Sequence, residues 1–130
     1  MLRLHEVIKP NLDGSLILPW PPSTNTLWRH TGNSVLISKK YRLYKRTIQK
    51  LSLFWRRKPL DCRISLHIKA YPPDKRKRDL DNILKGCIDS LQNAKLFLDD
   101  SQIDYLSIER MPSVKGGELH VIIKEIEEHL

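Results

Sequence analysis

Three aspartates near the middle of the chain, Asp79, Asp81 and Asp100, are candidates to hold a divalent cation. The first two follow directly after a run of four bases at positions 75–78. Carboxylates repel each other and also repel phosphate, so a cluster of them beside Lys and Arg indicates a hard cation between protein and phosphate. Nuclease chemistry needs that arrangement, and the pattern therefore predicts a metal-dependent DNA endonuclease.

Each acid also has a structural explanation. Asp79 stands at the start of a predicted helix and could be its N-cap, for which the odds are about even when the residue is taken alone. Asp81 lies in the first turn, where the helix dipole favours acids. These explanations account less well for the preceding bases and for Asp99 and Asp100, which follow the apolar segment 96–98.

Two neighbouring polar residues have two interpretations each. Lys85 lies four residues after Asp81 on the same helical face, where it could form a surface ion pair or contact the scissile phosphate or the attacking water. Asn82 could orient a ligand or cap the helix. The pattern leaves both alternatives open.

The charge balance points to a polyanionic partner. The chain has 23 Lys and Arg against 15 Asp and Glu, a formal charge of +8. Solubility alone could explain that excess, but the bases are clustered, which favours nucleic acid. Phosphate contacts of this kind give affinity without base identity. The candidate DNA-binding residues are Lys75, Arg76, Lys77, Arg78, Asn25, Arg29, His30, Lys45 and Arg46.

Several classes of protein are not indicated. The two cysteines, Cys62 and Cys87, lack zinc-ligand spacing and a disulfide framework, so both are expected to be small buried residues of a reducing cytoplasm. No apolar run approaches about 18 residues, and the N-terminus has no signal-peptide core. We expect a cytoplasmic, nucleoid-associated protein with no membrane contact, in which residues 1–130 form one domain.

The hydrophobic pattern predicts a mixed α/β protein of the α+β class: a small mixed sheet with two helices packed on one face. Strands are expected at about 16–18, 35–37, 63–70, 104–111 and 119–126, and helices at about 38–57 and 79–94. A turn at 115–117 should join the last two strands. The buried stripe of the first helix is predicted as Tyr41, Tyr44, Ile48, Leu51 and Trp55, and that of the second as Leu84, Cys87, Ile88 and Leu91.

The motifs in combination resemble the RusA family of Holliday-junction endonucleases. The matching segments are Arg78-Asp79-Leu80-Asp81-Asn82 with Lys85, then Leu98-Asp99-Asp100-Ser101-Gln102, upstream Leu18-Pro19-Trp20-Pro21-Pro22-Ser23 with Asn25, and downstream Met111-Pro112 and Lys115-Gly116-Gly117. The last two segments match the final hairpin of the family. The resemblance extends from about Leu16 to Ile126.

The resemblance implies a homodimer that binds four-way DNA junctions and cuts symmetrically paired strands with Mg²⁺ or Mn²⁺. Such genes are common in phages and prophages. By position, the essential acids and metal ligands fall on Asp79, Asp81 and Asp100, and the important lysine on Lys85. Asp99 and Asn82 would support them. One departure is the absence of a glycine after the second helix, which predicts a left-handed Lys95 or a different helix end.

Two alternatives to the junction endonuclease remain. One is a catalytically silent basic DNA-binding module whose acids only cap and pair, and metal-dependent cleavage of a synthetic junction would separate it from the enzyme. The other is a metal nuclease that acts on other branched DNA or on RNA, which competition between substrates would reveal.

Overall fold

The structure is a computed structural model that describes residues 15–22, 28–31, 34–37, 39–50, 53 and 58–126. Its strands are β1 (Ser15–Pro19), β2 (Trp28–Thr31), β3 (Ser34–Ile37), β4 (Ile64–Tyr71), β5 (Ile103–Arg110) and β6 (Glu118–Glu125). Its helices are α2 (Lys39–Gln49), α4 (Leu80–Asn93) and the short 3₁₀ helix η2 (Asp100–Gln102).

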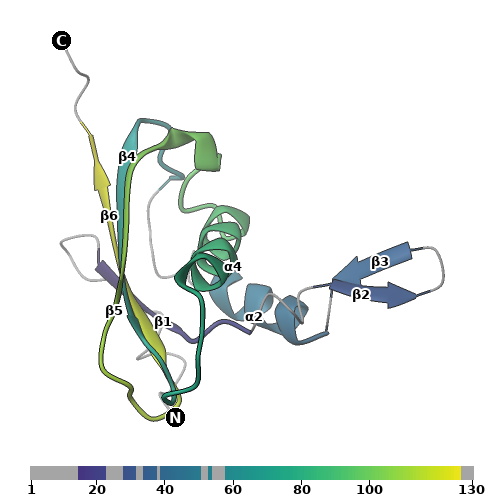
Figure 1. Cartoon of the computed structure of the whole chain (residues 1–130). Helices are drawn as coiled ribbons and strands as arrows, with labels where there is room; N and C mark the ends of the chain where they lie inside the picture. Colours follow the sequence, from purple (N-terminus) through teal and green to yellow (C-terminus); the bar gives the residue numbers. More distant parts are fainter. Residues whose placement is uncertain are drawn as a thin grey trace.

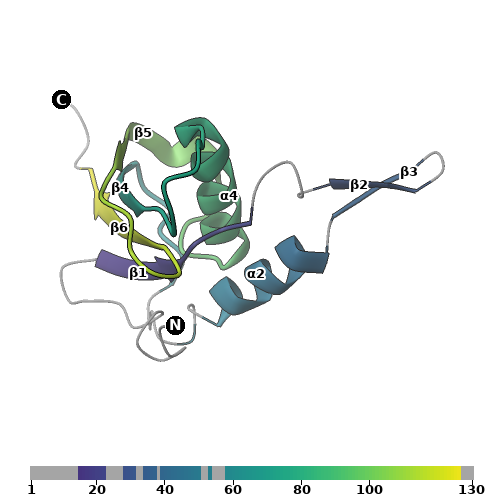
Figure 2. The ribbon, with the colours of Figure 1, turned by 60° about the horizontal axis from the view of Figure 1, so that its bottom comes forward.

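Four strands form a mixed sheet in the order β1-β6-β4-β5. Strand β4 pairs antiparallel with β6 and parallel with β5. Parallel neighbours need a long crossover connection, and α4 supplies it between β4 and β5. Both helices lie on the same side of the sheet (Figures 1 and 2). The predicted α+β class with helices on one face is confirmed.

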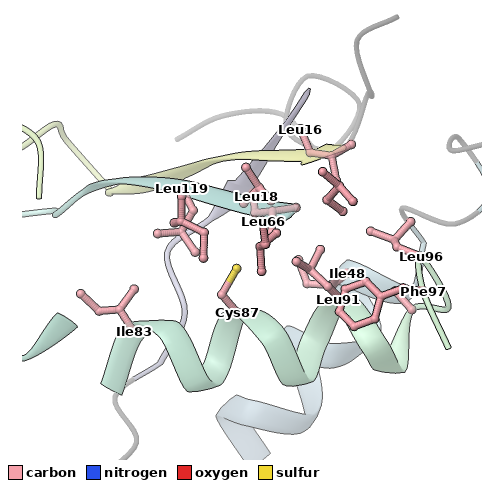
Figure 3. Close-up of a cluster of buried hydrophobic side chains, with 14 of the residues drawn as sticks. Leu16, Leu18, Ile48, Leu66, Ile83, Cys87, Leu91, Leu96, Phe97 and Leu119 are labelled. Carbon is pink, nitrogen blue, oxygen red and sulfur yellow. The ribbon is translucent and has the colours of Figure 1, made fainter. Parts of the chain in front are cut away.

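The core lies between α4 and the inward face of the sheet (Figure 3). In β4 the alternating residues Ile64, Leu66, Ile68 and Ala70 are all at most 1% exposed, because successive side chains of a strand point to opposite faces. The predicted alternation of this strand is confirmed. It fixes which side of β4 meets the helix, and therefore how α4 lies across the sheet.

The predicted buried stripe of α4 is confirmed at Cys87 and Leu91 and wrong at Leu84 and Ile88. The buried residues are Ile83, Gly86, Cys87, Ser90 and Leu91, whereas Leu84 and Ile88 are half-buried. Two of the buried residues, Gly86 and Ser90, are small: a Cβ on Gly86 would be in ordinary contact with Pro21 Cβ at 3.5 Å, and Tyr41 Oη donates to the Gly86 carbonyl. A stripe defined by large apolar residues leaves out such small buried residues.

Helix α2 corresponds to the first part of the helix predicted at 38–57, of which residues 51, 52 and 54–57 lie outside the described residues. It ends at Gln49, and its buried residues are Tyr41, Tyr44 and Ile48, in agreement with the first part of the predicted stripe. Leu51 and Trp55 lie outside the described residues. Strand β3 confirms the predicted strand at 35–37, whereas β2, which pairs with β3, was not predicted.

The expected hairpin between the last two strands is absent. Strands β5 and β6 lie on either side of β4, so their connection crosses the end of β4. It is held there by the Val114 N–H, which donates to the Pro72 carbonyl at 2.9 Å. The turn itself is confirmed by positive φ angles at Gly116 and Gly117. The left-handed Lys95 is also confirmed, with φ of 64° after α4.

Candidate functional site

Asp79 and Asp81 stand at the N-terminal end of α4 with exposed side chains. Asp79 occupies the N-cap position, yet its carboxylate makes no capping hydrogen bond. Asp79 is therefore the N-cap residue by position, where its charge suits the helix dipole, but its carboxylate is not engaged in a capping bond. Asp81 Oδ1 accepts from the Asn82 backbone N–H at 3.0 Å, so Asn82 contributes its main chain to orienting Asp81.

Lys85 lies one helical turn after Asp81 and is exposed. Residues four apart on a helix are neighbours on its surface, so the ammonium group can reach the space in front of the two acids. Among the described residues, Lys85 forms no ion pair with an acid. The surface ion pair is thus not formed here.

The basic segment before α4 is held by Asp74, a residue that the motifs did not single out. Asp74 Oδ1 lies 2.7 Å from Arg78 Nη1, and Asp74 Oδ2 lies 3.3 Å from Arg76 Nε. The bond from Arg78, with the Arg76 backbone N–H, lowers the pKa of Asp74 to about 2. Lys75 and Lys77 are exposed between these anchored residues. This segment, residues 74–78, is called the basic loop below.

Asp100 lies at the other end of α4, in η2, and its side chain is exposed. Gln102, which is only 9% exposed, builds the turn that carries it. Gln102 Oε1 accepts from the N–H groups of Leu98 and Asp99, each at 2.8 Å. Its Nε2 donates to the carbonyls of Leu60 and Cys62, also at 2.8 Å. One buried amide therefore ties the Asp100 turn to the segment before β4.

Three more contacts fix the same turn. The Asp99 carboxylate accepts from the Ser101 side chain and backbone N–H, which lowers the pKa of Asp99. Gln92 on α4 accepts from the Asp100 N–H at 3.1 Å. Arg63 donates to the Ser101 carbonyl at 2.7 Å and pairs with Asp104. Asp99 thus supports the turn, and Asp100 projects from it.

The three predicted metal ligands do not converge within one chain. Helix α4 has 14 residues, which corresponds to about 21 Å at 1.5 Å per residue. Asp79 and Asp81 stand at the N-terminal end of α4, whereas Asp100 lies in η2, beyond the C-terminal end of the helix. Figure 1 shows the helix lying between the basic loop at one end and the connection to β5 at the other. Within the described part of the chain, no three His, Cys, Asp or Glu side chains lie close enough to hold a metal together. Because α4 separates them, the three acids do not share a pocket within one chain, and their assignment to one metal stays a prediction.

Some of the predicted DNA-binding residues lie near the two ends of α4. The basic loop precedes its first turn, and Lys45 on α2 lines a groove with Gln92, Asn93 and Leu98 near its last turn. Arg46 is exposed on α2. Arg29 and His30 belong to β2, and Asn25 lies outside the described residues.

Neither cysteine forms a disulfide, and burial raises the pKa of the Cys87 thiol to about 12, so Cys87 is not a nucleophile. Cys62 is only half-buried, in contrast to the expectation of two buried cysteines. In the described ranges, no helix combines the length and apolar character needed to span a bilayer.

Comparison with known proteins identifies the family of this chain. Residues 19–124 match the family described as Endodeoxyribonuclease RusA. The crossover junction endodeoxyribonuclease RusA of Enterobacteria phage HK97 is 42% identical over 117 residues, which cover 85% of this chain and 93% of that protein. The proteins of the same name from Shigella sonnei (strain Ss046) and Escherichia coli (strain K12) are each 34% identical over 116 residues, which cover 86% of this chain and 94% of theirs. The chain therefore belongs to the RusA family of endodeoxyribonucleases.

Proposed function

We propose that this chain is a metal-dependent endonuclease that resolves four-way DNA junctions by hydrolysing phosphodiester bonds in paired strands, in DNA recombination and repair. The observation that carries the proposal is the pair of exposed acids, Asp79 and Asp81, directly behind the basic loop. Asp79 makes no capping hydrogen bond, so its carboxylate is available to hold a cation. The names of the relatives, crossover junction endodeoxyribonuclease, support a junction as the substrate.

The residues at the N-terminal end of α4 have separate roles in this reaction. The basic loop binds phosphates on either side of the cleaved bond by charge, which makes affinity dependent on salt. Lys85 lies on the face of Asp81 and stabilises negative charge on the phosphate or positions the attacking water. A bound Mg²⁺ or Mn²⁺ would supply Lewis acidity and a more acidic water. Two carboxylates suit such a hard cation, but the third predicted ligand, Asp100, does not fit the same site within one chain.

We infer that a second copy of the chain supplies the missing acid. Asp100 and the two other acids lie at opposite ends of α4, so a two-fold axis that relates two copies can bring Asp100 of one copy to Asp79 and Asp81 of the other. A two-fold pair necessarily makes two such sites. Two symmetric cuts across a junction also need two sites, so the homodimer meets both requirements. Lys45, near the Asp100 end, would then face the same DNA as the partner's basic loop.

The proposed substrate places the protein with the DNA of a bacterium or of a phage-infected cell, in the cytoplasm. A synthetic four-way junction, the matching duplex and a single strand test this substrate choice in competition. The junction should be cut with added Mg²⁺ and not with EDTA, and the duplex should remain intact. Equal cutting of the duplex would reject junction specificity.

Asp81→Asn tests the assignment of the acid. The variant keeps the size and hydrogen-bonding capacity of the side chain but removes its charge, so cutting should fall by about 10³-fold or more, which corresponds to about 4 kcal/mol. Junction binding should remain within about threefold of the wild type, because the basic loop is unchanged. Asp61→Asn, at an exposed acid before β4, is the matched control and should cut normally. Full cutting by Asp81→Asn would show that the assignment is wrong.

A further inference from the structure

A cleft of about 470 Å³ opens beside the first turn of α4. Leu80, which stands between Asp79 and Asp81, forms part of one wall with Ile83. The basic loop forms another wall, and the segment 110–113, which begins at the last residue of β5, forms the third side. Asp79 and Asp81 do not line the cleft, but they adjoin Leu80 in the chain, so the cleft opens next to the two acids.

The lining has an apolar floor and a cationic rim. Trp20, Ile83 and Met111 contribute apolar surface inside the cleft. The charged residues of the lining are five cations and one acid, namely Lys75, Arg76, Lys77, Arg78, Arg110 and Asp74. Asp74 is already engaged with two of the arginines, so the rim presents positive charge. A planar apolar group joined to an anion matches this distribution.

The walls are held in place by contacts within the chain. The Arg78 guanidinium lies 5.7 Å from the centre of the Trp20 ring and is anchored by Asp74. Arg110 donates to the Arg78 carbonyl, which ties the loop to the end of β5. Behind Trp20, a Cβ on Gly117 would lie 3.0 Å from Trp20 Cβ and 2.9 Å from Pro73 Cδ. The cleft is therefore built in advance of any ligand, as binding sites usually are.

We propose that this cleft takes an unpaired nucleobase of the bound DNA, from a nucleotide next to the phosphate at Asp79 and Asp81. The proposal rests on the proposed function and deepens it by naming the part of the substrate that sets the position of the cut. Base faces stack on aromatic and apolar side chains, and the linked phosphates lie against the cations. A base at a branch point is easier to unpair than one inside a duplex, so a junction supplies the ligand at least cost.

Junctions with a single abasic site test the proposal. One series places the abasic site at each position around the cleaved phosphate, and binding is measured without added divalent cation so that no strand is cut. Ser113→Trp, at an exposed residue of the rim, fills the cleft without removing any contact that holds it. Ser113→Ala leaves the cleft open and serves as the matched control.

The wild type and Ser113→Ala should lose at least about fivefold in affinity at one abasic position and little at the others. Ser113→Trp should bind every junction of the series equally and, with Mg²⁺, should cut at a broader set of positions. A flat abasic profile in a wild type that still cuts junctions would overturn the base pocket and leave the proposed function intact. An unchanged profile in Ser113→Trp would also overturn it. A wild type that neither binds nor cuts junctions would overturn both.

Discussion

Gln102 shows how one uncharged residue can determine where a charge lies. Its side chain has two donors and two acceptor lone pairs, and all four are used by backbone groups of residues 60, 62, 98 and 99. In the sequence, Gln102 is only the last residue of the motif that contains Asp99 and Asp100, and its type gives no sign of this role. Its role becomes visible only when the segment before β4 is seen beside the turn.

Gln102→Leu should destabilise the protein by about 2–4 kcal/mol, because several backbone groups lose their partner in a nearly buried position. The midpoint of urea denaturation measures this loss. Gln92→Leu is the matched control: it makes the same chemical change but removes one bond, to the Asp100 N–H, and should cost about 1 kcal/mol or less. Equal midpoints for the two variants would contradict the structural role of Gln102.

At the scale of elements, α4 acts as a spacer between two functional ends. Its length keeps Asp79 and Asp81 away from Asp100, and its small residues Gly86 and Ser90 bring it close to its neighbours. The connection between β5 and β6 also helps to position the charged residues, because Val114 bonds Pro72 and Gly117 packs against Pro73 at the start of the loop that leads to α4. These packing contacts, rather than the loops alone, determine where the charged residues stand.

Substitutions at Gly116 and Gly117 distinguish two costs of adding a Cβ to that connection, namely backbone strain and steric contact. Both have positive φ, which costs a residue with a Cβ about 1–2 kcal/mol. A Cβ on Gly116 would meet nothing within 4 Å, whereas one on Gly117 would press on Pro73 and Trp20. Gly117→Ala should therefore lower the free energy of unfolding by about 1–3 kcal/mol more than Gly116→Ala does. Thermal denaturation of the two variants tests this difference, and equal losses would argue against the close contact.

At the scale of the whole molecule, the separation of the acids makes a prediction about subunit mixing. If each site takes Asp81 from one copy and Asp100 from the other, a mixed dimer of Asp81→Asn and Asp100→Asn subunits has one site free of both substitutions. The two variants, each inactive alone, should regain nicking of one strand of a junction when mixed under conditions of subunit exchange.

The matched control for mixing pairs Asp79→Asn with Asp81→Asn. These substitutions lie at the same end of α4, so every site of the mixed dimer keeps one of them, and nicking should not return. Exchange is checked by native mass spectrometry with one subunit tagged. A mixture of Asp81→Asn and Asp100→Asn that exchanges subunits and stays inactive would rule out sites shared between copies.

Local residue patterns were enough to predict much of the secondary structure of this protein and its family. Period-two alternation identified β4, three- and four-residue steps identified α2 and α4, and two glycines identified the turn at 115–117. The motifs around Asp79 and Asp100 also indicated the family, because residue types and short spacings are properties of the chain itself. In α4, Cys87 and Leu91 were predicted correctly as buried, whereas Gly86 and Ser90 were missed because the burial of a small residue depends on the neighbouring element.

Only the tertiary structure decided how far apart the acids stand and which residues hold them. A sequence separation of some 20 residues is compatible with contact or with the full length of a helix, and here the helix intervenes. The same holds for the order of the strands, the anchoring of the basic loop by Asp74 and the cleft beside Trp20. These features depend on contacts between segments distant in the chain, and such contacts follow from packing in three dimensions rather than from local pattern.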